Sequence, residues 1–262
     1  MKKFKFLYQM KLDFSIDATN HSYTLKCIPQ SDIRQQLHHI EMELLPSMSY
    51  QEAMDSFGNA YIFGRYIPPH NEFKIQVSGE VDTGLQPYLI EEKPQNVGMF
   101  RIQTPCTTPG TAIQTFFEEN YVRGSNPLNC AIDLMHKLYN VFTYETGSTR
   151  VESTAEEAMA QGKGVCQDYS HIMLSLCRKA GIPARYVVGM LEGEGASHAW
   201  IEIYQDGKWY GLDPTNNLVV DDIHMKISHG RDYKDCAINK GLLCGGGYQK
   251  QSVIVVMEEL LQ

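Results

Sequence analysis

The sequence predicts an α+β protein, with a β-rich region followed by helices and a second group of strands. Apolar residues alternate with polar ones in several short runs within the first hundred residues. They recur at helical spacing between residues 128 and 180, and alternation returns after residue 185. Because the helices come as a group before these later strands, rather than alternating with them, the pattern favours α+β.

Four runs of alternating apolar residues predict strands in the first hundred residues. The segment Asp55-Ser-Phe-Gly-Asn59 carries turn residues between two of these strands. Short strands separated by turns are typical of an antiparallel sandwich or barrel. We therefore expect a sandwich-like β domain over residues 1–100. The runs are centred on Leu12–Ile16, Tyr23–Cys27, Ile40–Leu44 and Phe73–Val77.

Helical signals begin after a segment rich in proline. Prolines and a glycine interrupt the pattern between residues 95 and 110, which places the domain boundary near residue 100 and a second domain over 101–262. One helix is expected around 128–139, and a capping box within 153–157 opens another in either of two registers. A third helix starts near Cys166 and ends at Gly181-Ile-Pro183.

Strands are expected again over 185–191, 198–204 and 209–213. The apolar run 252–257 predicts one more strand, buried on both faces. The second domain thus consists of helices and an antiparallel sheet.

Composition and charge argue against several classes of protein. The formal net charge of −8 over 262 residues does not suit a nucleic-acid binder, because Lys2, Lys3 and Lys5 form the only basic cluster. No stretch approaches the ~18 apolar residues of a membrane span, and the start lacks the apolar core of a signal peptide. We therefore expect a cytoplasmic protein without nucleic-acid or membrane partners.

The seven cysteines indicate neither a disulfide framework nor a metal site. Their number is odd, and no two have CxxC spacing, which fits a reducing compartment. His229, Cys236 and Cys244 lie near one another in the sequence, but their spacing matches no zinc ligand pattern. We expect no metal and no cofactor.

Cys166 occupies a position that suits a nucleophile. Gly162 and Gly164 end any preceding helix, so that Cys166 lies in the first turn of the next one. A helix N-terminus favours the reactive thiolate, and its unpaired amides can bind an oxyanion. The apolar stripe formed by Tyr169, Met173 and later residues places Cys166 on the buried face, directed towards a sheet.

A predicted hairpin brings a histidine close to an aspartate. Asp206-Gly207 is a strong signal for a two-residue turn, which pairs residues whose numbers add up to 413. Trp200 then lies opposite Asp213, and His198 is on the same face as a diagonal neighbour of Asp213. A three-residue loop would instead place His198 and Asp213 on opposite faces.

Each of these residues also has a simpler interpretation. A single cysteine is more often a small buried side chain than a nucleophile. A histidine at the start of a strand is usually structural, and Asp-Pro commonly opens a turn. Taken by themselves, the patterns leave an enzyme and a protein without catalytic activity about equally plausible.

Four blocks of the sequence together resemble the core of the transglutaminase-like superfamily. They occur in the family's order: Gly164-Val-Cys-Gln-Asp-Tyr-Ser-His171, Ala180-Gly-Ile-Pro-Ala-Arg-Tyr186, His198-Ala-Trp-Ile-Glu202, and Trp209 with Leu212-Asp-Pro-Thr-Asn216. Gly230-Arg-Asp-Tyr233 and the β region before residue 100 resemble the bacterial branch of that superfamily.

The resemblance implies a papain-like core and a Cys-His-Asp mechanism acting on a peptide or protein substrate. By match to the motifs, Cys166 attacks a carbonyl carbon, His198 transfers protons and Asp213 orients the imidazole. Hydrolysis by a cysteine peptidase or amidase is the first interpretation, and transfer to an amine by a transglutaminase is the second. A binding module without catalysis is the third, although all three residues of the triad are present.

Overall fold

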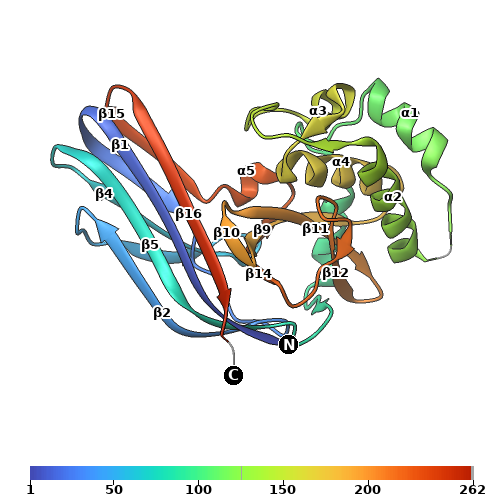
Figure 1. Ribbon diagram of the computed structural model, residues 1–262, viewed down its shortest axis with the longest axis horizontal. Coiled ribbons are helices and arrows are strands. Elements are labelled where there is room, and N and C mark those ends of the chain that lie inside the picture. The colour runs from blue at the N-terminus through green and yellow to red at the C-terminus, as the bar shows by residue number, and fades with distance from the viewer. Residues whose placement is uncertain (125, 261–262) are drawn as a thin grey trace.

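Two large antiparallel sheets and a layer of helices build the protein (Figure 1). The structure is a computed structural model that describes residues 1–124 and 126–260. One sheet forms an elongated wall on the left of Figure 1, and the helices cover the second sheet on the right. The α+β class is therefore confirmed.

The N-terminal sheet is organised around one long strand, β1 (Lys2–Leu25). The first half of β1 lies between β5 and β16, and its second half lies between β4 and β15, with a shift in register between residues 13 and 18. The region is one eight-stranded sheet, whereas the sequence pattern suggested a sandwich-like arrangement. The other strands are β2 (Gln36–Leu45), β3 (Gln51–Met54), β4 (Ala60–Tyr66), β5 (His70–Thr83), β10 (Gly193–Gly195), β15 (Asn239–Gly245) and β16 (Gln249–Glu259).

The last two strands return to this first sheet. The sequence analysis assigned them to the second domain, but β15 and β16 both pair with β1. The expectation that the last strand is buried on both faces is wrong. In β16, Val255 and Met257 are buried while Ile254 is 47% exposed, because only one face of the strand packs on the core.

The second sheet has the register that the hairpin signal predicted. Asp206 and Gly207 adopt left-handed φ values of 50° and 80°, as a two-residue turn requires. The pairs from Gln205–Lys208 to Ile201–Leu212 follow in the expected order. The strand order is β13-β12-β11-β9-β14, with β6 beside β12. These strands are β6 (Leu89–Ile90), β9 (Ala184–Leu191), β11 (His198–Gln205), β12 (Lys208–Asp213), β13 (Leu218–Val219) and β14 (His224–Gly230).

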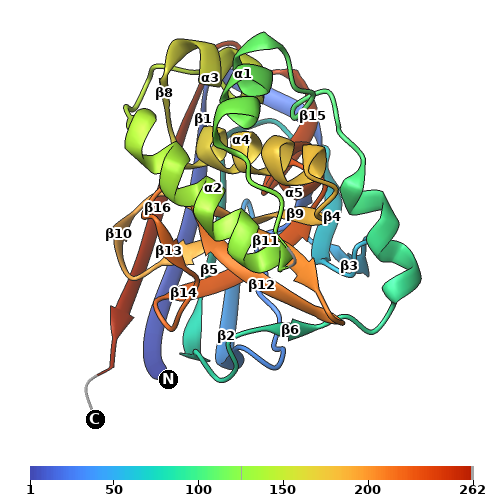
Figure 2. The ribbon, with the colours of Figure 1, turned by 90° about the vertical axis from the view of Figure 1, so that its right-hand side faces the viewer.

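The helices form a layer over one face of this second sheet (Figure 2). Helix α4 lies directly on β9 and β11, and α1, α2 and α3 pack around it. All residues from 168 to 178 are buried, so α4 is surrounded by protein and buries more than the predicted apolar stripe. The helical elements are η1 (Pro94–Arg101), α1 (Thr111–Asn120), α2 (Pro127–Val141), α3 (Ala155–Gln161), α4 (Cys166–Lys179) and α5 (Tyr233–Cys236); the short strands β7 (Thr143–Tyr144) and β8 (Lys163–Gly164) pair in parallel.

The predicted capping box opens α3 in one of the two expected registers. The Thr154 hydroxyl accepts a hydrogen bond from the Glu157 amide at 3.2 Å, and the Glu157 carboxylate accepts one from the Thr154 amide at 2.8 Å. Helix α1 was not predicted. The carboxylate of Glu156, in the first turn of α3, accepts hydrogen bonds from three amides at the start of α1. The two helices therefore fix each other's position.

A tight contact behind the second sheet holds the strand that carries His198. The ring of Trp200 packs against Gly189 of the neighbouring strand, where a Cβ atom would clash with the ring and with the carbonyl oxygen of Met225. We expect Gly189→Ala to lower the free energy of unfolding by about 1–3 kcal/mol. Urea unfolding would measure it. Gly195→Ala, where a Cβ meets nothing within 4 Å, is the matched control and should change little. Equal stability of the two variants would contradict this packing.

Candidate active site

Cys166 is the first residue of α4 and is partly buried against the core. Among the described residues, no acceptor engages the backbone amides of Cys166 and Gln167, whereas the next two amides bond to the Val165 carbonyl. Two donors therefore remain at the tip of the helix beside the sulfur. This arrangement suits an oxyanion, because the helix N-terminus carries partial positive charge.

Asp168 and Gly164 fix the backbone that leads into this helix. The Asp168 carboxylate accepts hydrogen bonds from the Val165 amide at 2.8 Å and the Thr149 hydroxyl at 2.7 Å. A Cβ atom on Gly164 would clash with this carboxylate, so the glycine is required for its approach. Asp168 therefore supports the start of α4.

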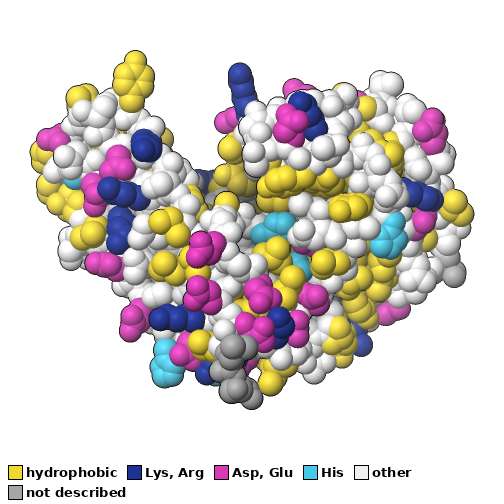
Figure 3. Space-filling model, in the orientation of Figure 1, with side chains coloured by type: hydrophobic (Ala, Val, Ile, Leu, Met, Phe, Trp, Pro, Cys, Tyr) yellow, Lys and Arg dark blue, Asp and Glu magenta, His cyan; other side chains and the backbone are white. Residues whose placement is uncertain are grey.

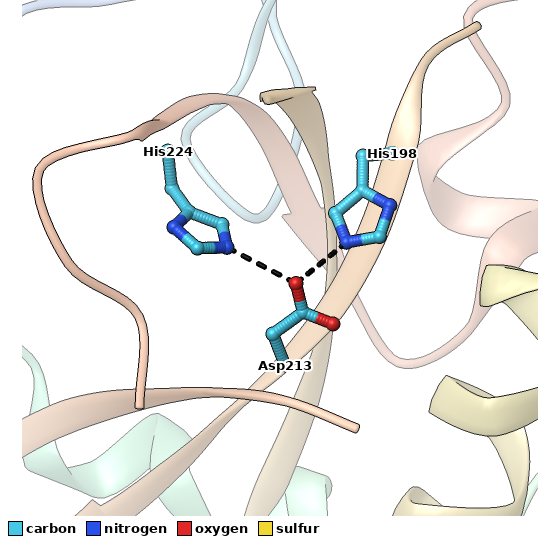
Figure 4. A group of neighbouring side chains, drawn as sticks. All are labelled: His198, Asp213 and His224. Carbon is cyan, nitrogen blue, oxygen red and sulfur yellow. Dashed lines mark hydrogen bonds and ion pairs between the residues drawn. The ribbon is translucent and has the colours of Figure 1, made fainter. Parts of the chain in front are cut away.

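His198 and Asp213 meet across the hairpin as the register predicted. His198 Nε2 lies 2.8 Å from Asp213 Oδ2 and donates to it (Figure 4). In this tautomer Nδ1 is the nitrogen that can exchange a proton with a thiol. Asp213 is fully buried, and its carboxylate also accepts hydrogen bonds from the Thr215 amide and from the amide and side chain of Asn216. The Asp-Pro-Thr-Asn turn thereby holds the carboxylate in place.

The electrostatics of the pair keep the imidazole protonated. Burial alone would lower the pKa of His198, but its interactions with Asp213 and Cys166 outweigh this effect and raise the pKa from 6.5 to about 10. Burial would likewise raise the pKa of Asp213, yet the hydrogen bonds from His198 and His224 hold it well below its usual range. The protonated ring can donate a hydrogen bond to the Cys166 sulfur.

His224 is a buried residue of this site that the sequence analysis did not identify. Its Nε2 lies 3.1 Å from the same Asp213 oxygen, and its Nδ1 lies 3.1 Å from Asp221 Oδ1. In Figure 4 the two imidazoles approach the Asp213 carboxylate from opposite sides. No local pattern marks His224, because it lies in a strand that pairs with β9 and not with the hairpin.

Structural roles account for Gln161, His171 and Trp200. The Gln161 side chain is exposed and donates to the Ser148 carbonyl oxygen at 3.0 Å, which accounts for it as a solvated helix end. His171 is buried and accepts a hydrogen bond from the Tyr233 amide at 3.2 Å. Trp200 is buried with Val187 and Val220, so core packing explains it.

Tyr144 lies near the Cys166 sulfur, and the sequence analysis did not predict it as a site residue. Tyr144 in β7 pairs with Gly164 in β8, and its side chain is 53% exposed. Burial and the nearby Cys166 raise the pKa of its hydroxyl.

On the face seen in Figure 3, the surface is hollowed between the tip of the N-terminal sheet and the helices, and histidine and hydrophobic side chains lie below this notch.

One group of metal-ligating atoms exists among the described residues. The nitrogens of His198 and His224 and an oxygen of Asp213 lie within 4.8 Å of one another. Two imidazoles and a carboxylate are a donor set that zinc accepts. Here, however, both nitrogens are directed at one carboxylate oxygen, and the contacts of 2.8 and 3.1 Å are those of hydrogen bonds. We therefore interpret the group as a hydrogen-bonded network.

Two family models match this chain, and one of them includes the site just described. Residues 117–214 match the transglutaminase-like superfamily core, which includes Cys166, His198 and Asp213. Residues 5–82 match the bacterial transglutaminase-like N-terminal region. The chain belongs to the transglutaminase-like superfamily. The order of the two regions is that of the bacterial branch suggested by the sequence.

Similar proteins extend over most of this transglutaminase-like chain. An uncharacterised protein of Mycobacterium leprae is 28% identical over 266 residues, covering 93% of this chain and 94% of that protein. One from Mycobacterium tuberculosis is 25% identical over 249 residues, covering 82% and 79%. A crystal structure from Cytophaga hutchinsonii, provisionally assigned as a cysteine protease, has a TM-score of 0.82 and 21% identity, covering 100% of this chain and 91% of that one. This likeness confirms the fold.

No helix within the described residues is long and apolar enough to cross a membrane.

Replacing Asp213 with asparagine tests the electrostatic coupling. The folded pKa of His198 is about 10 and lies above the unfolded value of ~6.5. The stability that this pair contributes is therefore complete below pH ~6.5 and is lost as the pH rises through about 10. We expect the stability difference between wild type and Asp213→Asn to shrink across this window, measured by urea unfolding at several pH values. Asp133→Asn, on a carboxylate of α2 that is 51% exposed, is the control. A difference independent of pH would contradict the coupling.

His224 is expected to position Asp213. His224→Leu removes a hydrogen bond to the carboxylate, whereas His224→Gln can retain a donor. We expect a roughly tenfold to hundredfold loss of turnover in the leucine variant, as for other residues that orient a catalytic group, and partial recovery in the glutamine variant. NMR titration of His198 should show a shifted pKa in His224→Leu only. A purely structural role would instead reduce stability in both variants without moving that titration.

Proposed function

We propose that this protein is a thiol-dependent amidohydrolase, a cysteine peptidase or amidase that cleaves peptide, amide or isopeptide bonds. The observation that carries the proposal is the contact of 2.8 Å between His198 and Asp213, next to Cys166 at the tip of α4. Superfamily membership and the described fold support it. The substrate class, a peptide or protein, follows from the same proposal, and the cytoplasmic location stays a prediction.

The reaction would begin with a thiolate–imidazolium pair. The Cys166 sulfur attacks the carbonyl carbon, and the developing oxyanion is bound by the amides of Cys166 and Gln167. The C–N bond then breaks as His198 gives its proton to the leaving amine, which leaves a thioester on Cys166. Asp213 stabilises the imidazolium and keeps Nδ1 directed at the sulfur.

Water would complete the cycle. His198, now neutral, takes a proton from a water molecule that attacks the thioester carbon. The carboxylic acid leaves, the sulfur returns to its thiolate form, and the imidazolium is restored. An amine in place of water would give a transglutaminase reaction through the same thioester, so the acceptor has to be tested directly.

Alkylation provides the first test of the nucleophile. Cys166 should react with iodoacetamide at least tenfold faster than a free thiol, because the adjacent imidazolium favours the thiolate. Cys244 is exposed in β15, far from His198 in the fold, and serves as the matched control within the same molecule. Peptide mapping by mass spectrometry measures both rates, and His198→Ala should abolish the difference. Equal rates in the wild type would contradict activation and favour a binding module.

Product analysis tests hydrolysis itself. A peptide library incubated with the protein should yield cleaved peptides or free ammonia, and Cys166→Ala should remove this activity while Cys244→Ala keeps it. EDTA should leave the rate unchanged, because the two histidines are engaged with Asp213. Incorporation of a labelled amine without hydrolysis would replace the proposal by a transglutaminase. Absence of both products over the whole library would overturn the enzymatic proposal.

A further inference from the structure

A cavity away from Cys166 and His198 lies on the face of the second sheet that does not carry α4. Ile201 and Ile203 belong to the core under the helices, so Glu202 between them and Arg185 opposite it are directed to the other side. There a cavity of about 500 Å³ is enclosed by the segment 30–35, the turn 54–59 and the stretch 89–100. Its size is that of a small-molecule site, and neither Cys166 nor His198 lines it.

Arg185 and Lys226 line the floor of this cavity, and both contact the buried carboxylate of Glu202. Arg185 Nε lies 2.6 Å from Glu202 Oε2, and Lys226 Nζ lies 3.1 and 2.8 Å from the two oxygens of Glu202. The Arg185 and Glu202 side chains are only 6% and 2% exposed. Buried ion pairs lose about as much by desolvation as they gain by attraction, so stability does not account for them well. Their position in a cavity suggests binding.

Three cations and two carboxylates lie beside the floor of the cavity. Arg34, Arg185 and Lys226 are cationic, whereas Glu202 and Asp32 are the carboxylates among them. The Asp32 carboxylate accepts hydrogen bonds from the backbone amides of residues 34 and 35. The Arg34 guanidinium group donates hydrogen bonds to the carbonyl oxygens of residues 220 and 221. Burial and the cations around it lower the pKa of His229 well below 6.5, so its ring adds no charge.

Three further carboxylates line the wall. Asp55 is bound by Lys26 and Asn59. Glu91 accepts a hydrogen bond from the indole nitrogen of Trp209 at 2.6 Å, and Glu92 is exposed at the rim. Recognition of a carboxylate therefore rests on the free donors of Arg185 and not on a net positive charge of the cavity.

Glu202 and Trp209 hold the guanidinium group of Arg185 in place, and part of that group has no hydrogen-bond partner among the described residues. Its guanidinium carbon lies 4.1 Å from the centre of the Trp209 ring, and its Nε is fixed by Glu202. Its two terminal nitrogens have no hydrogen-bond partner among the described residues. A planar pair of donors held in this way matches the two oxygens of a carboxylate. Apolar side chains beside it, including Phe57 and Phe100, provide the wall for an apolar group.

We propose that this cavity binds a small organic carboxylate. The carboxylate contacts the terminal nitrogens of Arg185, and the apolar part of the ligand lies against Phe57 and Phe100. The site is separate from the triad, so this proposal does not depend on the amidohydrolase activity.

Tryptophan fluorescence tests the proposal, because Trp209 contacts Arg185 and the chain has only one other tryptophan. The probe is phenylacetate, and phenylacetamide is its uncharged counterpart. We expect a saturable change with a Kd of about 1 mM or below, which corresponds to roughly −4 kcal/mol. Phenylacetamide should bind at least tenfold more weakly. Trp209→Phe should remove the signal.

Single substitutions test where phenylacetate binds. Arg185→Gln should weaken binding of phenylacetate at least tenfold, while Arg65→Gln, on an exposed arginine of β4, should not change it. Should Arg185→Gln fail to fold, Phe57→Ala on the turn should weaken binding of both compounds. Equal binding of phenylacetate and phenylacetamide, unchanged affinity in the variants, or no response up to about 10 mM phenylacetate would overturn the proposal. Running the same titrations in Cys166→Ala keeps the result independent of catalysis.

Discussion

The buried carboxylate of Asp213 is the interaction on which the arrangement of the site depends. A fully buried charge is tolerated only when its hydrogen-bonding capacity is filled, and here donors come from two histidines, a backbone turn and Asn216. These donors belong to β11, β14 and the turn after β12. Burying this one charge therefore fixes three elements relative to each other, and the orientation of the His198 imidazole follows from it.

Much of the fold and of the site could be predicted because the signals were local. Asp206-Gly207 determined the hairpin register, and the register determined that His198 and Asp213 share a face. The glycines before Cys166 and the Gly-Ile-Pro segment after α4 likewise marked that helix within one or two residues. In each case the relevant contact lies within about fifteen residues of the pattern that predicts it.

The elements that escaped prediction depend on partners that are distant in the sequence. His224 joins the site because β14 pairs with β9, and no turn signal encodes that pairing. Helix α1 begins where backbone amides donate hydrogen bonds to Glu156, which lies more than forty residues later in the sequence. The membership of β16 in the N-terminal sheet depends on β1, at the other end of the chain. Periodicity identifies a strand, but it does not identify its neighbour.

The position of β16 beside β1 has a consequence for how the chain matures. During synthesis, β1 emerges more than two hundred residues before the strand that covers one of its edges. Until then the first half of β1 presents unpaired amides and carbonyls, and an open edge of this kind invites pairing between nascent chains.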